Sequence, residues 1–266
     1  MPEKSVNSLG GFLLVMVVVG YACLLLIGPI IALINEAFNE SIGQIIHSII
    51  QADALQALSL TILISFFTVI IDGVLGLLVA WVLVRHKFWG RDFFNSLVDI
   101  PFVISPVIVG YVMIVLFGRL GWFKFIPIAF TPYAMLLVTV FVTLPFVIRE
   151  VMPVLASLSN EQEEAAYTLG ASRWYSFRRV IFPALRPALI YGLVLSLARS
   201  LGEFGAAAVA GGAIQGATEN ATIYIFRSLH DRNDIGAYSM ALLLGIISIV
   251  VLLLMNILKA KESKGN

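Results

Sequence analysis

The sequence Glu164-Ala-Ala-Tyr-Thr-Leu-Gly170, which leads on to Phe182-Pro183, is a charged segment between two long apolar runs. Ser159 and Gln162 have the spacing of a capping box, so a helix is predicted to start there. Glycine at position 170 is predicted to end that helix, because glycine adopts the left-handed backbone conformation without a Cβ clash. Ser172 is predicted to begin a second short helix, and Pro183 lies at its exit into the next apolar run.

This second helix is rich in arginine, and Pro187 also follows it. The segment is therefore predicted to form two short helices joined by a tight bend at a membrane surface. An ordinary amphipathic connector between two spans would carry the same signals, since capping boxes and glycine stops are common. These local features alone leave open whether the segment is a docking surface for another protein or only a connector.

The composition predicts a polytopic membrane protein. Of the 266 residues, 60% are hydrophobic and 12% charged, with a mean hydropathy of +0.98. A soluble domain does not carry so much apolar surface. A single cysteine, Cys23, excludes a disulfide framework, and a net charge of +1 gives no argument for nucleic acid.

Six apolar runs predict an all-α fold of six transmembrane helices in one transmembrane domain, residues 1–266, with a surface loop at about 155–186. The first run is longer than the core of a signal peptide and is expected to be a retained span. The polar stretch after it, around His47, predicts a short surface helix. The expected spans are about 9–34, 59–84, 94–117 (with kinks at Pro101 and Pro106), 132–148, 188–210 and 237–258.

Charge sets the expected orientation. With the N-terminus inside, twelve Lys and Arg residues fall on the inner side and four on the outer side, while Arg199 lies within a span. The positive-inside rule then predicts a multi-pass protein of the cell (inner or plasma) membrane with both termini in the cytoplasm. The segment around Gly170 would face the cytoplasm.

Three charged residues lie at membrane depth, where such residues are costly. Asp72 is either a functional site or a bond to a neighbouring helix, and both alternatives stay open. Arg199 and Glu203 are four residues apart, so their side chains should meet. A structural ion pair is the preferred interpretation over an anion path, which would need a free arginine. Gly202 and Gly205 would allow another backbone to approach, at a subunit interface or a narrow gate.

No catalytic machinery is visible, so the chain is not expected to be an enzyme. It lacks a P-loop, its three histidines are scattered, and no metal-ligand spacing occurs. If ATP drives a process here, another polypeptide must bind it.

The segment that opened this section resembles the signature loop of ATP-binding-cassette (ABC) importer permeases. The apolar Ile and Leu positions of that pattern hold Val180 and Phe182. In such permeases the loop is a coupling helix that seats in a groove of a cytoplasmic ATPase. The residues that match the pattern are Glu164, Ala165, Ala166, Gly170 and Pro183.

The stretch Leu201-Gly-Glu-Phe-Gly-Ala206 is similar to a segment of the sulfate, molybdate and tungstate branch of these permeases. From the second span onward the chain most resembles the W-type subunits of sulfate/thiosulfate importers, and further matching stretches are residues 99–106, 116–122 and 141–153. This resemblance implies a type I (MetI-like) importer permease fold. It also implies import of a tetrahedral oxyanion, with sulfate or thiosulfate preferred.

The resemblance implies several partners and no cofactor on this chain. The partners are two cytoplasmic ABC ATPases that carry ATP and Mg, a second permease that is T-type or identical, an extracytoplasmic anion-binding protein, and the lipid bilayer. The loop 211–235 departs from the W-type pattern, which weakens the assignment of the substrate. Molybdate or tungstate import by a homodimer remains an alternative.

The expected mechanism is alternating access about the kinked third and fifth spans, with the anion met by helix N-termini, backbone N–H groups and hydroxyls. Candidate hydroxyls are those of Ser105, Thr139, Thr143 and Ser196. From another class, a secondary transporter could use Asp72 and Glu203 as proton or sodium sites. A membrane enzyme is a third, weaker alternative.

Overall fold

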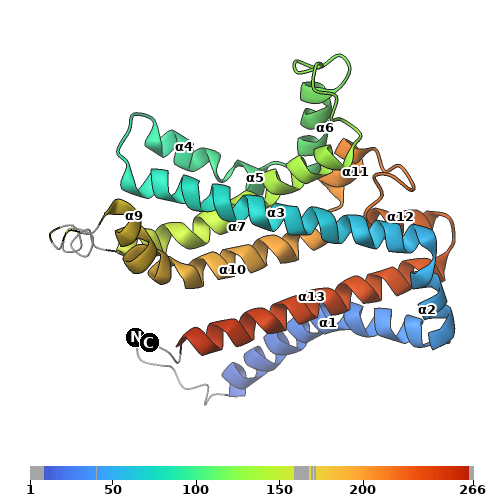
Figure 1. The fold of residues 1–266 in the computed structure, drawn as a ribbon. Coiled ribbons are helices and arrows are strands. Elements are labelled where there is room, and N and C mark those ends of the chain that lie inside the picture. The colour runs from blue at the N-terminus through green and yellow to red at the C-terminus, as the bar shows by residue number, and fades with distance from the viewer. Residues whose placement is uncertain (1–8, 40, 159–167, 169, 171, 264–266) are drawn as a thin grey trace.

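The computed structural model describes residues 9–39, 41–158, 168, 170 and 172–263, which form helices and loops with no strand among them (Figure 1). Five helices are long and apolar enough to cross a membrane, which takes about 20 residues, and a bent pair of helices can count as a sixth span. The expected all-α polytopic fold is confirmed. The five continuous helices are α1 (Leu9–Asn39), α3 (Ala52–Arg85), α7 (Pro132–Ser157), α10 (Phe182–Leu201) and α13 (Asp234–Ser263).

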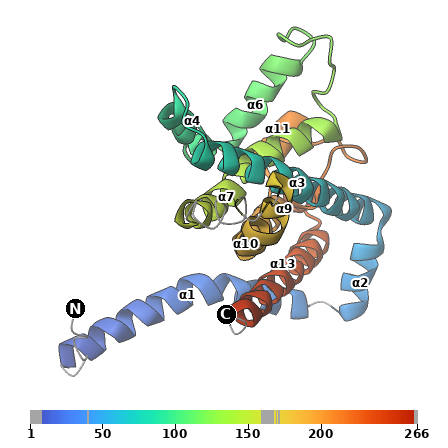
Figure 2. The same cartoon turned by 60° about the vertical axis from the view of Figure 1, so that its left-hand side comes forward.

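Helices α3, α7 and α10 pack together as the centre of the bundle (Figure 2). Buried apolar side chains from all three meet around Val147 of α7. A Cβ atom on Gly76 of α3 would lie only 2.6 Å from Cγ1 of Val147, and one on Gly192 of α10 would lie 2.8 Å from its Cα. Small residues therefore bring both neighbouring helices close to α7, as is usual between membrane helices.

Helix α1 lies at the edge of the bundle. It contacts α13, and its N-terminal part points away from the bundle (Figure 2). None of its residues whose burial is described is buried. Helix α2 (Ile42–Ile50) follows it and includes His47, so the expected short surface helix is confirmed. Its first turn is closed by a capping box between Ser41 and Gln44.

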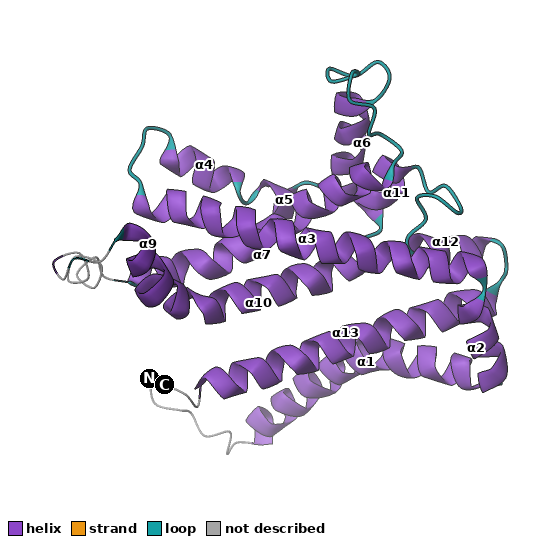
Figure 3. Ribbon diagram, in the orientation of Figure 1, coloured by secondary structure: helices purple, strands orange, loops and turns teal. Residues whose placement is uncertain are grey.

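The third span is broken rather than merely kinked. Helices α4 (Arg91–Leu97) and α5 (Ile100–Val103) are followed by α6 (Pro106–Phe117), and the chain turns by 111° between Val103 and Pro106. Pro101 and Pro106 each stand in the first turn of a new helix, where the missing N–H leaves no hydrogen bond unmade. Helix α6 consequently points away from the bundle (Figure 3).

The fifth span, expected to be a kinked helix over about 188–210, is broken into two helices. Helix α10 ends at Leu201, and α11 (Gly205–Gly211) begins after a short non-helical link. The carboxylate of Glu203 accepts the backbone N–H of Ala206 at 2.9 Å and so satisfies a donor at the start of α11. A polar side chain at this position thereby favours a new helix start over continuation.

The span is longer at its other end. Helix α9 (Arg173–Ser176) and the π-helical turn η1 (Phe177–Ile181) lead without a loop into α10. Pro187 therefore lies inside α10, whereas Pro183 lies in the first turn of α10, where proline is tolerated.

Two further elements differ from expectation. Helix α7 continues to Ser157 through Pro145 and Pro153, well past the predicted end at residue 148. The loop 211–235 contains α12 (Ala221–His230), which was not predicted. Its N-cap is Asn220, whose side-chain oxygen accepts the N–H of Ile223 at 3.0 Å.

Candidate functional site

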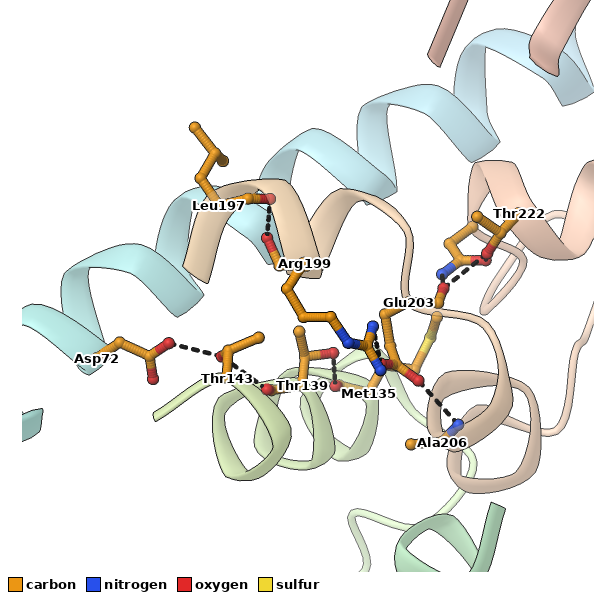
Figure 4. A network of polar contacts seen from close by, with 11 residues as sticks. Asp72, Met135, Thr139, Thr143, Leu197, Arg199, Glu203, Ala206 and Thr222 are labelled. Carbon is orange, nitrogen blue, oxygen red and sulfur yellow. Dashed lines mark hydrogen bonds and ion pairs between the residues drawn. The ribbon is translucent and has the colours of Figure 1, made fainter. Parts of the chain in front are cut away.

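Asp72 bonds the three central helices to one another. It is fully buried on α3. Its Oδ2 accepts the hydroxyl of Thr143 on α7 at 2.6 Å and that of Ser196 on α10 at 2.5 Å. The sequence left two roles open for Asp72, and the geometry shows one of them, a bond to neighbouring helices at membrane depth. Figure 4 shows the Asp72–Thr143 contact within a larger polar network.

The candidate pore hydroxyls are mostly engaged inside the chain. Thr139 is buried and donates to the carbonyl of Met135 at 2.7 Å (Figure 4). Thr143 and Ser196 are also buried and bind Asp72, whereas Ser105 is an exposed residue at the start of α6. Contact between any of these hydroxyls and an anion stays a prediction.

Arg199 and Glu203 form the expected ion pair. Arg199 lies in the last turn of α10, and its Nη1 is 2.8 Å from Oε2 of Glu203. The Glu203 side chain is 2% exposed and the Arg199 side chain 32%. The pair therefore sits beside the break between α10 and α11, with its carboxylate buried and its guanidinium partly open (Figure 4).

The residues that begin α12 also bind Glu203, through its backbone. Its backbone carbonyl accepts Nδ2 of Asn220 at 2.7 Å and the hydroxyl of Thr222 at 2.6 Å (Figure 4). Sequence reasoning missed both residues. The available signal was Asn220 itself, an N-cap residue directly before an apolar-periodic stretch.

The two glycines of this region have different surroundings. A Cβ atom on Gly205 would lie 3.2 Å from Cγ2 of Val107 on α6, so a neighbouring helix does approach closely there. Gly202 is exposed, and the nearest atom to such a Cβ is the Arg199 carbonyl at 3.9 Å. A Cβ atom on Gly202 would therefore have room, and the part of Gly202 in a subunit interface stays a prediction.

Two further arginines fasten elements together and were not singled out from the sequence. Nε and Nη2 of Arg149 on α7 bind the two carboxylate oxygens of Asp99 at 2.8 and 2.7 Å, and Nη1 binds Oδ1 of Asn95 at 2.9 Å. Arg227 on α12 binds Glu219 through Nε at 2.6 Å and reaches Asp231 through Nη1 at 3.4 Å. The hydrogen bond to Glu219 is the main reason that the pKa of Arg227 is raised above its ordinary value.

Much of the predicted coupling segment lies outside the described residues. This applies to Glu164, Ala165 and Ala166 and to the predicted capping box at 159–162. Gly170 has a φ of +82°, the left-handed conformation expected at a helix end. Ser172 caps α9 by accepting the N–H of Tyr175 at 3.2 Å, as predicted, and Pro183 is exposed.

A sequence-family model described as "Binding-protein-dependent transport system inner membrane component" matches residues 72–264. The chain belongs to this family. The sulfate transport system permease protein CysW of Synechocystis is 40% identical and aligns over 94% of this chain and 93% of its own length. CysW of Escherichia coli K12 is 39% identical over 88% and 83%, and CysT of the same strain is 37% identical over 91% and 89%.

Solved importers of the same kind share the fold. A bacterial alginate ABC transporter, in complex with its alginate-bound periplasmic protein, matches with a TM-score of 0.75, 19% identity and 95% coverage of both chains. The MetNI methionine ABC transporter matches with a TM-score of 0.60 and 19% identity over 78% of this chain and 94% of that one. At these identities the likeness shows the fold alone. The chain is thus an ABC importer permease of the MetI-like fold, and its relatives are named as permeases rather than enzymes.

Proposed function

We propose that this permease is the W-type transmembrane subunit of an ATP-driven importer of sulfate, with thiosulfate as a second substrate. The observation that carries the proposal is the identity of 37–40% to sulfate permeases over about nine-tenths of the chain. The W-type relatives are slightly more similar than the T-type relative of the same strain. Escherichia coli K12 carries both a CysW and a CysT permease, which supports a heterodimeric arrangement with a T-type permease.

The transport cycle we propose is alternating access. Helices α3, α7 and α10 move as one body, because Asp72 and the two glycine contacts at Val147 bind them together. The link between α10 and α11, and the break before α6, are the places where this body changes its angle to the rest. Such short irregular links absorb the backbone rotations of a hinge.

The energy for this cycle comes from two cytoplasmic ATPases that carry ATP and Mg. They bind the surface loop at about 155–186, where the bend at Gly170 separates the predicted coupling helix from α9. In this arrangement both termini lie in the cytoplasm and an extracytoplasmic binding protein delivers the anion. The first residues of α1 and the last of α13 lie at the same end of the bundle (Figure 1). This supports the placement of both termini on the same side of the membrane.

The test is reconstitution of the chain with a T-type permease, the ATPase and the binding protein in proteoliposomes. We expect ATP-dependent uptake of radiolabelled sulfate, competed by thiosulfate. Uptake of molybdate or tungstate in place of sulfate would reassign the substrate. Uptake that follows an ion gradient and needs no ATPase would reject the importer altogether.

The coupling role of the bend at Gly170 has its own test. A valine at this position would be strained at a φ of +82°. We expect Gly170→Val to insert normally and to hydrolyse ATP without sulfate uptake. Normal uptake by this variant would contradict the assignment of the coupling loop.

A further inference from the structure

Three arginines with carboxylate partners differ in how much of each guanidinium the protein uses. All three nitrogens of Arg149 have partners, in Asp99 and Asn95. All three nitrogens of Arg227 have partners as well, in Glu219 and Asp231. Arg199 has one partner among the described residues, the contact between its Nη1 and Glu203.

The unused donors of Arg199 are unusual for their place in the fold. A guanidinium carries N–H groups on all of its nitrogens, so Nε and Nη2 of Arg199 have hydrogen-bonding capacity that the described chain does not meet. The residue lies within a transmembrane helix, where arginine side chains pair with other groups or mark a substrate pathway. Its side chain is 32% exposed, so a ligand can reach it.

The chain just after Arg199 leaves open space at the end of α10. Gly202 follows Arg199 by three residues and lies just past the end of α10 at Leu201. It is exposed, and a Cβ atom there would have no neighbour nearer than 3.9 Å. No side chain at this position covers the approach to Arg199.

We propose that Arg199 contacts the tetrahedral oxyanion during its passage, and that Glu203 is the counter-ion that keeps this contact weak. The inference rests on the proposed function and names the residue that recognises its substrate. A guanidinium suits an oxyanion because its planar N–H donors match paired oxygens. Nε and Nη2 can make that contact while Nη1 stays bound to Glu203.

The hydrogen bonds of Glu203 explain why this counter-ion stays in place beside Arg199. Its carboxylate is held by Ala206, and its carbonyl by Asn220 and Thr222. A lone arginine in a low-dielectric setting would attract a doubly charged anion strongly. Passage requires binding that favours entry and still allows release. A fixed carboxylate beside the arginine provides this compromise.

The experiment uses the complete importer in proteoliposomes with saturating sulfate-loaded binding protein. Two quantities are measured per inserted complex: the rate of radiolabelled sulfate uptake, and the sulfate retained by the purified complex at equilibrium without the binding protein. We expect Arg199→Gln to lower both by about tenfold or more, the effect of one charge-assisted contact. Arg199→Lys should recover part of the uptake, because it restores the charge without the planar donors.

Glu203→Gln separates recognition from a purely structural role. We expect it to raise sulfate retention by about tenfold while uptake falls, because the anion leaves a less neutralised arginine slowly. Arg227→Lys is the control, since Arg227 has similar exposure but no unused nitrogen and lysine keeps a cation opposite Glu219; uptake per inserted complex should stay within about twofold.

Several outcomes would overturn the inference. Equal effects of Arg199→Gln and Glu203→Gln on retention would make the pair structural, and so would sulfate uptake and retention by Arg199→Gln at the unmodified level. Failure of the unmodified importer to take up sulfate would instead reject the proposed function, which the same assay measures first.

Discussion

The Arg199–Glu203 pair and the Arg227–Glu219 pair are alike in residue type and in burial. In both, the carboxylate side chain is 2% exposed and the arginine about one-third exposed (32% and 29%). They differ in saturation: Glu219 faces two nitrogens of its arginine, whereas Glu203 faces one and shares its other oxygen with a backbone N–H. Burial and charge pairing alone therefore do not distinguish a structural ion pair from an ion pair whose arginine keeps N–H donors available for a ligand.

The largest stability effect is expected from Arg227→Gln. Among the described residues the carboxylate of Glu219 has Arg227 as its one partner, so this buried group would be left unpaired. Removal of one partner of a buried pair costs about 3–5 kcal/mol, and partial exposure of Arg227 places the effect near the lower end. Thermal unfolding of the purified complex measures it. A loss smaller than that of Arg199→Gln would break the comparison.

Arg199→Gln should destabilise less, by about 2 kcal/mol, because it removes a single ion-pair contact whose arginine is about one-third exposed. Glu203 keeps its bond to the N–H of Ala206, and its carbonyl keeps both donors from α12. Double-mutant cycles of the two pairs, read by the same unfolding assay, should give the smaller coupling energy at Arg199–Glu203. Equal coupling energies would show that the count of engaged nitrogens does not matter.

Asp72 extends the comparison to a carboxylate held by hydroxyls. Asp72→Leu would leave Thr143 and Ser196 without their shared acceptor, at a cost of about 2 kcal/mol. Asp72→Asn keeps a carbonyl oxygen for both donors, so stability should change by less than about 1 kcal/mol and ATP-dependent uptake should persist. Loss of uptake in the stable Asn variant would instead favour an ion-coupling role for Asp72.

The smallest stability effect is expected from Gly202→Ala. There is space for the added methyl group, with no atom nearer than 3.9 Å, so stability should change by less than about 0.5 kcal/mol. Sulfate uptake should nevertheless fall if the surface beside Arg199 is part of the anion path. Gly205→Ala is the contrasting variant, because its methyl group would press on Val107 at 3.2 Å and reduce stability.

The amino-acid sequence predicted those features that depend on local composition and spacing. Runs such as 237–258 are long and apolar enough to require a membrane, and the i, i+4 spacing of Arg199 and Glu203 predicted their contact. The left-handed Gly170 and the cap at Ser172 likewise follow from local backbone preferences. The prolines of the third span signalled a distortion, but its size of 111° depends on where α6 finds a packing partner, at Gly110 against Ala206.

By itself, then, the sequence determined that this chain is a bundle of membrane helices with a bent surface segment and three charged residues at depth, because hydrophobicity and helix spacing act over a few turns. Only the tertiary structure decided which partners those charges have. Thr143 and Ser196 reach Asp72 across 71 and 124 residues, and Asn220 and Thr222 bind the carbonyl of Glu203 from the start of α12, 17 and 19 residues further along the chain. A hydrogen bond depends on the position of both groups in space, and so the unused donors of Arg199 became visible only after the helices had been placed.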